Sequence, residues 1–340
     1  MKNTGIRRFS ILLFCVLVFQ TLCAQKKDSG TFKILFGSCN RTELPNPFWD
    51  QMAAAQADVF IWGGDAIYAD TRNMRKMKKM YRAQKSIPEY KAFAESIPVM
   101  GTWDDHDYGL NDAGAEYAEK QKSQQLFLDF IGMPSDAETR QTEGVYASKD
   151  FSVSGKTIKI IVLDTRYFRS KLKRATDPEK RYVPSTDTTA TMLGKEQWAW
   201  LAKELSEDAD FTVIMSSVQF LSKEHGFETW GNFPHEVARF EQLIKESNSK
   251  AVILLSGDRH IAEFSKKELP GLQYPLIDFT SSGLTHTYTA FDGEPNSNRV
   301  GEVVTLKNYG LVAIDLSTNE VHFKMMGENN EVLQALTQDY

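Results

Sequence analysis

Side chains of the types that bind metal ions follow four separate apolar runs of this 340-residue chain. Thiolate, imidazole, phenolate and carboxylate groups are the protein ligands of transition metals and of hard cations. In α/β sheets, ligands gather at the carboxyl ends of strands, so four such ends could build one metal centre. The chain is therefore predicted to be a metal-dependent hydrolase. The side chains concerned are Cys39, Asp65, Tyr68, Asp104, Asp105, His106, Asp258 and His260.

Asp65 and Tyr68 come just after an apolar run that ends in two glycines, Gly63 and Gly64. The glycines allow the backbone to turn sharply and approach a ligand. The two oxygens of Asp65 are free to bridge two cations. The hard phenolate of Tyr68 favours a trivalent ion such as Fe³⁺ over Mg²⁺. A turn aspartate beside a packed tyrosine is an equally good interpretation of this pair taken alone.

The run Asp104-Asp105-His106-Asp107 places four ionisable groups next to one another. Such groups repel and desolvate one another unless a cation or solvent compensates them. We expect Asp105 to be a ligand and His106 to be a proton donor or phosphate contact, because histidine protonates leaving groups near neutral pH. The alternative is a solvated acidic turn.

Asp258 and His260 follow another apolar run, and their spacing would place both on the same face of an extended segment, with Arg259 pointing away. Taken without Asp258, His260 could equally be interpreted as a structural histidine. Cys39 lies in a Gly-Ser-Cys-Asn context after a strand, which favours a thiolate ligand. Its alternative is a buried apolar cysteine.

Arg166 follows the predicted strand 157–163 and has two open interpretations. It could clamp a phosphate with two parallel hydrogen bonds, or it could pair with Asp164 and shape the loop. The charged segment 169–191 is predicted to be a surface loop near the site. His286 is a candidate for the rim of the site.

The first 24 residues are predicted to be a cleaved signal peptide. Lys2, Arg7 and Arg8 precede the apolar run 11–18, and Ala24 offers a small residue for cleavage. A lipid anchor at Cys23 is disfavoured because the preceding residue, leucine, is large. We therefore expect a secreted or periplasmic protein. No later segment is apolar and long enough to span a membrane.

The charge balance disfavours a nucleic-acid-binding surface. Three of the 40 basic residues lie in the first 24 positions, which leaves 37 basic against 45 acidic residues and a net charge of −8. Phosphate esters are still possible ligands, because bound metal ions supply positive charge locally.

Strand and helix patterns alternate along the chain, which predicts an α/β architecture with layered sheets and outer helices. We find no convincing domain boundary after the signal segment. The predicted strands are 31–37, 59–63, 97–102, 157–163, 212–217, 251–256, 276–280, 303–306, 310–315 and 321–326, and the predicted helices are 47–57, 113–131, 194–205 and 239–246.

Six motifs, in order along nearly the whole mature chain, resemble those of the PhoD-like alkaline phosphatases in the calcineurin-like metallophosphoesterase superfamily. The Trp-Asp-Asp-His and Leu-Gly-x-x-Gln-x-x-Trp-Leu motifs are the most specific. The motifs are Gly37-Ser38-Cys39, Gly64-Asp65-Ala66-Ile67-Tyr68, Trp103-Asp104-Asp105-His106, Leu163-Asp164-Thr165-Arg166, the run 193–201 and Gly257-Asp258-Arg259-His260.

The resemblance implies a four-layer αββα sandwich with two mixed sheets, and we expect one catalytic domain over residues 30–340. One departure from the family's longer members is that no N-terminal β domain is expected, because the first predicted strand begins just after the signal segment. The resemblance also implies an Fe³⁺ and a second metal, expected to be Ca²⁺, with Asp65 bridging the two and His106 as the catalytic histidine. The implied iron ligands are Cys39, Asp65, Tyr68 and His260, and the implied ligands of the second ion are Asp105 and Asp258.

Two further departures from the family pattern bear on the site. Many metallophosphoesterases carry a lone histidine after the strand that corresponds to 212–217, whereas this chain has Ser216-Ser217-Val218-Gln219 there. Gln219 is a candidate replacement for that ligand. The chain also ends soon after a strand, so a C-terminal helical lid is expected to be absent and the site more open.

The predicted activity is hydrolysis of phosphate mono- or diesters, or both, by attack of a metal-bound hydroxide, with His106 protonating the leaving group. A small-molecule or lipid phosphate ester is the expected partner, and we expect a monomer. One alternative is a phospholipase-type phosphodiesterase. Another is a non-catalytic protein with structural Ca²⁺ that binds a glycan or lipid through the aromatic loop around Trp230.

Overall fold

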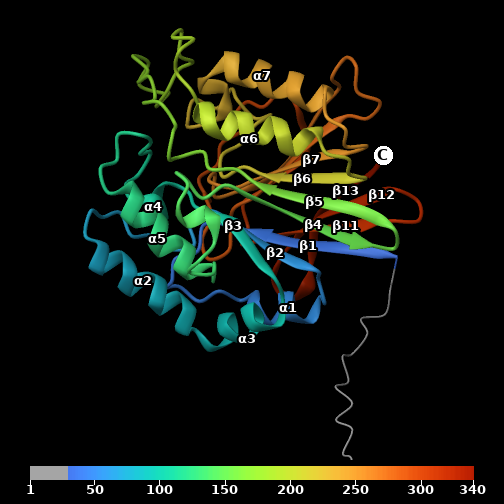
Figure 1. Cartoon of the computed structure of the whole chain (residues 1–340), viewed down its shortest axis with the longest axis horizontal. Coiled ribbons are helices and arrows are strands. Elements are labelled where there is room, and N and C mark those ends of the chain that lie inside the picture. Colours follow the sequence, from blue (N-terminus) through green and yellow to red (C-terminus); the bar gives the residue numbers. More distant parts are fainter. Residues whose placement is uncertain (1–29) are drawn as a thin grey trace, which may run out of the picture.

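The computed structural model describes residues 30–340. The predicted signal segment 1–24 lies outside these residues, as does Cys23. The described part of the chain folds into two sheets that lie face to face, with helices on both outer sides (Figure 1). No helix among residues 30–340 is long and apolar enough to cross a bilayer.

The first sheet has the strand order β13-β12-β11-β1-β2-β3. Strands β1, β2 and β3 are parallel to one another, while β11, β12 and β13 continue the sheet in antiparallel pairs, so the sheet is mixed. The strands are β1 (Thr31–Gly37), β2 (Val59–Gly63), β3 (Val99–Thr102), β11 (Tyr309–Asp315), β12 (Glu320–Met326) and β13 (Val332–Asp339).

The second sheet has the order β10-β8-β9-β7-β6-β5-β4 and is also mixed. Strands β5, β6, β7 and β9 are parallel, whereas β4 and β8 pair with their neighbours in antiparallel fashion. The strands are β4 (Ala147–Val153), β5 (Lys156–Val162), β6 (Phe211–Met215), β7 (Val252–Ser256), β8 (Ala262–Lys267), β9 (Leu276–Ser281) and β10 (Arg299–Val304).

Three apolar layers hold the sheets and helices together. Successive side chains of a strand point to opposite faces, and β2 follows this rule: Phe60 and Trp62 face the helices, while Val59 and Ile61 face the second sheet. The third layer joins the second sheet to α6 and α7. The helices are α1 (Trp49–Ala54), α2 (Met74–Ser86), α3 (Pro88–Ser96), α4 (Asp105–Tyr108), α5 (Lys120–Phe130), α6 (Gly194–Ser206) and α7 (Pro234–Lys245).

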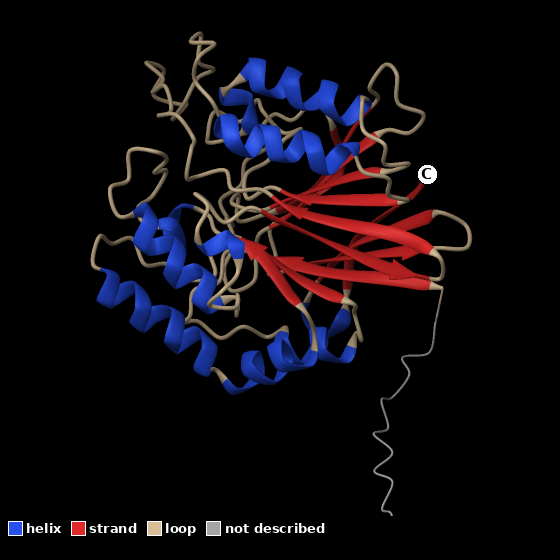
Figure 2. Ribbon diagram, in the orientation of Figure 1, coloured by secondary structure: helices blue, strands red, loops and turns tan. Residues whose placement is uncertain are grey.

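This arrangement confirms the predicted fold class, a four-layer αββα sandwich with two mixed sheets (Figure 2). A segment that carries candidate site residues comes directly after each of five parallel strands, namely β1, β2, β3, β5 and β7. The carboxyl ends of parallel strands meet at one edge of a sheet, and this is why residues far apart in sequence come together.

One predicted helix differs clearly from the structure. Residues 113–119 form turns, and the helix begins only at Lys120. The turns are fixed from both sides: a Cβ on Gly114 would lie 2.4 Å from the carbonyl oxygen of Arg169, and the N–H of Asp112 donates to Asp105 at 2.6 Å. Contacts at the site therefore override the helical sequence pattern of residues 113–119.

Candidate metal centre

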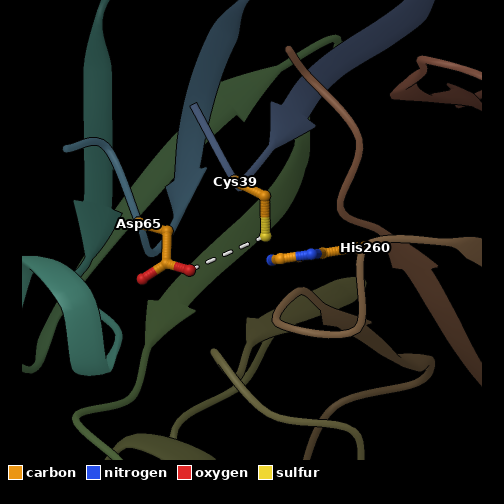
Figure 3. Close-up of side chains that lie close together, drawn as sticks. All are labelled: Cys39, Asp65 and His260. Atoms are coloured by element: carbon orange, nitrogen blue, oxygen red, sulfur yellow. Dashed lines mark hydrogen bonds between the residues drawn. The ribbon is translucent and has the colours of Figure 1, made fainter. Parts of the chain in front are cut away.

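Cys39, Asp65 and His260 come from three different strand ends and meet at one point (Figure 3). Their ligand atoms lie within 4.8 Å of one another. The Cys39 Sγ is 3.7 Å from the Asp65 Oδ2, and it lies at the same distance from the backbone oxygen of Asp258. A thiolate, a carboxylate and an imidazole at this spacing could all contact one ion.

Asp65 also belongs to a second cluster of the same kind, with Asp105 and His106, whose ligand atoms again lie within 4.8 Å of one another. The carboxylate of Asp65 is 1% exposed and stands between the two clusters. Because a carboxylate has two oxygens, this position suits a ligand that serves two cations.

Tyr68 and Asp258 complete the group of side chains predicted from the sequence. The Tyr68 hydroxyl lies 3.0 Å from the His260 Nε2, and its ring centroid lies 4.2 Å from that of His106. Asp258 lines a cavity together with Asp105, His106 and His260. The structure thus brings all six predicted metal ligands and His106 to one edge of the two sheets.

The backbone at this edge is turned into the left-handed region, which is uncommon for residues other than glycine. The φ angles are 60° at Cys39, 52° at Asp65, 68° at Asp258 and 55° at His260. Residues held in such conformations cluster at functional sites, where the surrounding structure must maintain them.

The same angles correct the prediction for Arg259. Because Asp258 and His260 are not extended, the rule that alternate residues share a face does not apply, and Arg259 also lines the cavity. Its guanidinium donates to Glu294 at 2.7 Å and lies 4.2 Å from the ring centroid of Phe227.

His106 is oriented by the carboxylate of Asp70, which is not among the predicted site residues. The His106 Nδ1 lies 2.9 and 2.8 Å from the two oxygens of Asp70, and its Nε2 lies 3.8 Å from the Asp105 Oδ1. Burial opposes charge on this imidazole, but Asp65, Asp105 and Asp70 outweigh that effect and raise its pKa to about 11.

The cavity side of the site has an excess of buried negative groups. Burial raises the pKa of Asp65 and Asp258 well above the usual value, and nearby acids raise both further. Burial and the charge of Asp65 likewise raise the pKa of the Cys39 thiol. Burial also lowers the pKa of His260 to about 3, which keeps the imidazole neutral and able to bind a metal.

Asp105 supplies a second sign that a cation fits here. Its Oδ1 is buried and has no hydrogen-bond partner within the described part of the chain. Burial alone would raise the pKa of this carboxyl, but His106 and Arg166 outweigh it and lower the pKa, so the oxygen is ionised. An ionised, desolvated oxygen without a hydrogen-bond partner is costly, and a bound cation would compensate it in addition to the His106 imidazole 3.8 Å away. The donor set present therefore fits metal ions.

The cavity beside these clusters has a volume of about 310 Å³, at the lower end of the range for small-molecule sites. Its outer wall contains Phe227 and Tyr288 together with the charged side chains of Arg181 and Arg259. Arg181 lies on the segment 169–191, so part of this loop does reach the site. Its guanidinium donates to Asp112 at 2.9 Å.

Arg166 does not contact the cavity, which corrects its prediction as a phosphate clamp. The side chain is 0% exposed. Its Nε donates to the Asp104 Oδ1 at 2.6 Å and its Nη1 to the Glu228 Oε2 at 2.6 Å. The alternative pairing with Asp164 is also wrong for the guanidinium, because only the backbone N–H of Arg166 donates to that carboxylate.

Two further expectations need correction. Gln219, the candidate replacement for the lone histidine, is buried and donates to Glu263 at 2.7 Å and Thr280 at 2.8 Å, so it belongs to another hydrogen-bond network. Trp230 is 0% exposed and packs against Trp198 and Phe240, so its ring is part of the core and offers no surface to a glycan or lipid.

Three site residues were missed: Asp70, Asp112 and Glu228. Asp70 lies only two positions after the candidate ligand Tyr68, and this closeness is a sequence signal that points to it. Glu228 lies in a loop without any recognisable pattern, and only its buried contact with Arg166 reveals its role.

Comparisons with known proteins show which family this chain resembles. The model of the PhoD-like phosphatase family matches residues 34–324. Alkaline phosphatase D of Bacillus subtilis (strain 168) is 23% identical over 311 residues, with 78% of this chain and 53% of that protein covered. The chain thus spans about half the length of this curated relative.

Solved structures share the fold at low sequence identity. A structure of PhoD has a TM-score of 0.70 and 19% identity, and the match covers 90% of this chain and 68% of that one. GAP50, described as the anchor in the inner membrane complex of Plasmodium, has a TM-score of 0.59 and 13% identity, covering 91% and 89%. A dimetal phosphatase from Danio rerio has a TM-score of 0.52 and 13% identity, covering 91% and 99%.

The match to the family model covers most of the chain and includes all the candidate metal ligands. It confirms the resemblance that the sequence motifs indicated. This chain belongs to the PhoD-like phosphatase family.

Proposed function

We propose that this chain is a secreted phosphoesterase that hydrolyses phosphate mono- or diesters, or both, with the help of two cations. One observation carries the proposal: Asp65 is shared by two clusters of metal-binding side chains, and both clusters lie beside a cavity that His106 also lines. Family membership supports the same reaction class.

The donor types suggest a specific pair of metals. Cys39, Tyr68 and His260 offer a thiolate, a phenolate and an imidazole, which suit iron in its trivalent state. Asp105 and Asp258 offer hard carboxylate oxygens, which suit Ca²⁺. When bound, the two cations would stabilise charge on the phosphoryl oxygens and lower the pKa of water.

His106 is the proposed general acid. Asp70 holds the Nδ1 of its imidazole and so fixes the plane of the ring, while the Nε2 remains available at the cavity. A proton on the Nε2 can pass to the leaving oxygen of the ester. Cations bound to Asp65 and Asp105 would neutralise two of the carboxylates that raise the pKa of this histidine.

Arg41 is the proposed contact for the phosphate group in place of Arg166. Its side chain is exposed, and its guanidinium lies 5.0 Å from the ring centroid of Tyr68. The other two guanidiniums near the cavity, those of Arg181 and Arg259, are paired with Asp112 and Glu294.

Secretion rests on the sequence of the first 24 residues, which resembles a cleaved signal peptide with a basic start and an apolar run. We further propose that the mature protein acts as a monomer.

Hydrolysis of p-nitrophenyl phosphate and of bis(p-nitrophenyl) phosphate tests the proposal. In His106→Asn, kcat for the preferred ester is expected to fall by about 10²–10⁴-fold, because the general acid is lost while the donors Cys39, Asp65 and His260 remain. Elemental analysis should find the same iron content as in the unaltered protein, because His106 is not among the proposed iron ligands.

The matched control is His322→Asn, which alters a histidine on β12 that interacts with Glu320 and Thr337. It should leave kcat unchanged. If His106→Asn kept full activity, the assigned role of this histidine would be wrong. If the metal-loaded parent protein hydrolysed neither ester, the non-catalytic alternative would be favoured.

A further inference from the structure

Helix α2 presents an unusual concentration of positive charge. Residues 72–86 contain seven basic side chains and no acidic one, although the whole chain has a net charge of −5. All seven are exposed. We call this surface the α2 basic face; it consists of Arg72, Arg75, Lys76, Lys78, Lys79, Arg82 and Lys85.

The basic side chains of this face repel one another. Arg75, Lys78 and Arg82 follow at intervals of three and four residues, which places them side by side along one stripe of the helix. Like charges at these intervals destabilise a helix. The opposite stripe, with Met77, Tyr81 and Gln84, is buried against the core, so the helix cannot rotate to separate the charges.

No carboxylate among residues 30–340 forms an ion pair with a side chain of the α2 basic face, in contrast to neighbouring cations such as Lys122 and Arg140. Two of its members donate to carbonyl oxygens instead: Lys76 to Ala69 at 2.7 Å and Lys85 to Asp129 at 3.1 Å. The face therefore carries a net positive charge that an anionic surface could neutralise.

A shallow apolar hollow lies within this charged surface, between α2 and α5. Its volume is about 380 Å³. Met74 and Leu126 contribute apolar side chains to it, and Arg75, Lys78 and Lys122 contribute basic ones. A phospholipid could place its phosphate group at the basic side chains and its hydrocarbon over the apolar ones. A soluble polyanion would use only the charges.

We propose that the α2 basic face binds the surface of a bilayer that contains anionic phospholipids. The helix lies on the outside of the molecule (Figure 1), and the surface attraction of several basic side chains adds up. Arg72, two positions before the start of α2, lines a cavity with Asn111 and Asp112, and these two residues also line the cavity at the metal centre. Binding through α2 would hold the site close to the lipid headgroups. The proposal does not depend on the proposed activity.

Sedimentation with two kinds of vesicle tests this proposal on the full chain. One kind contains phosphatidylcholine alone, and the other contains equal parts of phosphatidylcholine and phosphatidylglycerol. Because the apolar run 11–18 would bind both kinds, the measured quantity is the ratio of the two partition coefficients. The unaltered chain should prefer the anionic vesicles, and the preference should weaken as the salt concentration rises.

The triple variant Lys78→Ala, Lys79→Ala, Arg82→Ala is expected to lower that ratio by about a hundredfold, because each basic side chain near an anionic leaflet contributes about a fivefold factor. The matched control is Lys195→Ala, Lys203→Ala, Lys245→Ala, which removes the same charge from exposed positions on α6 and α7. The control should keep the ratio of the unaltered chain. Circular dichroism should show the same folded structure for both variants.

Three results would overturn the proposal. The first is equal binding of the unaltered chain to the two kinds of vesicle. The second is an equal loss of preference in both triple variants, which would indicate only an effect of net charge. The third is binding of the unaltered chain to heparin without any preference for anionic vesicles, which would make the face a site for soluble polyanions.

Discussion

Two groups of buried or half-buried carboxylates lie beside each other in this protein, and they are compensated in different ways. In the arginine-paired group, Asp104 and Glu228 accept from the guanidinium of Arg166 at 2.6 Å, and Arg169 lies 2.9 Å from Glu228. In the cavity group, Asp65, Asp105 and Asp258 have no arginine or lysine ion pair within residues 30–340.

Burial raises the pKa of carboxyls in both groups, so desolvation alone does not distinguish them. The two groups differ in the source of the positive charge that compensates them. The arginine-paired group carries its own cations and is closed to solvent, whereas the cavity group meets an open cavity and has no arginine or lysine ion pair among the described residues. This difference indicates that the cavity group is built to receive cations from outside the chain.

The largest expected effect is that of Asp65→Asn, which alters the one carboxylate common to both donor clusters. We expect kcat/KM for the preferred ester to fall by about a thousandfold or more, because the cations supply several kcal/mol of transition-state stabilisation. Phosphatase kinetics on the purified variant measures this effect.

The stability of the same variant sharpens the comparison. Without metal, Asp65→Asn should unfold at the same temperature as the unaltered chain or higher, because it removes a buried carboxyl whose ionised form is disfavoured by desolvation. Asp278→Asn, in a buried carboxylate that accepts hydrogen bonds from Ser256, Phe220 and Leu221, is the control. It should lower stability and retain metal. A metal-free Asp65→Asn protein with full activity would contradict the account.

Arg166→Met should have the opposite thermodynamic signature. Removal of this guanidinium leaves Asp104 and Glu228 buried without their main cation. Removing one partner of a buried ion pair lowers the free energy of unfolding by about 3–5 kcal/mol. Urea unfolding of the metal-loaded protein measures it, and a loss below about 1 kcal/mol would show that Arg166 is not the main compensating charge.

The pH dependence of stability should depend on metal. In the metal-free protein, burial raises the pKa of Asp65 and Asp258, so the folded state keeps protons that the unfolded chain releases above about pH 4. The stabilising charge of His106 is fully present below about pH 6.5 and is lost as the pH rises through its folded pKa of about 11. Both effects lower stability as the pH rises.

Chelator-treated protein is therefore expected to lose several kcal/mol of stability between about pH 5 and pH 9. Metal-loaded protein should lose much less, because coordination favours the ionised ligands. Denaturant unfolding at several pH values distinguishes the two forms. Identical pH dependence with and without chelator would indicate that the cavity group is not a metal site.

The buried parallel strands could be predicted from the sequence, because β1, β2 and β7 are short, mostly apolar runs with an acidic or sulfur-containing residue two positions beyond each end. Strands β4 and β13 could not. Each lies at the edge of a sheet and has several exposed or half-exposed positions, so neither forms the apolar run that marks a buried strand. Helix α2 was missed for a similar reason, since its basic composition hides a narrow buried stripe.

The candidate metal ligands could also be identified from the sequence as one group, because each follows such a run closely. Their partners could not. Arg166 and Glu228 are 62 positions apart, and nothing in either local sequence indicates that one charge compensates the other. As a result, Arg166 was assigned to the cavity, although its charge belongs to the arginine-paired group.

Metal content tests the central claim most directly. The account predicts that purified, folded protein contains about two metal ions per chain, with iron and calcium found by elemental analysis and a visible charge-transfer band from the Cys39 and Tyr68 ligands. Asp65→Asn should lose both ions and the band. Folded, active protein without bound metal, or an unchanged metal content in Asp65→Asn, would contradict the claim that the cavity group receives its counter-charge from cations.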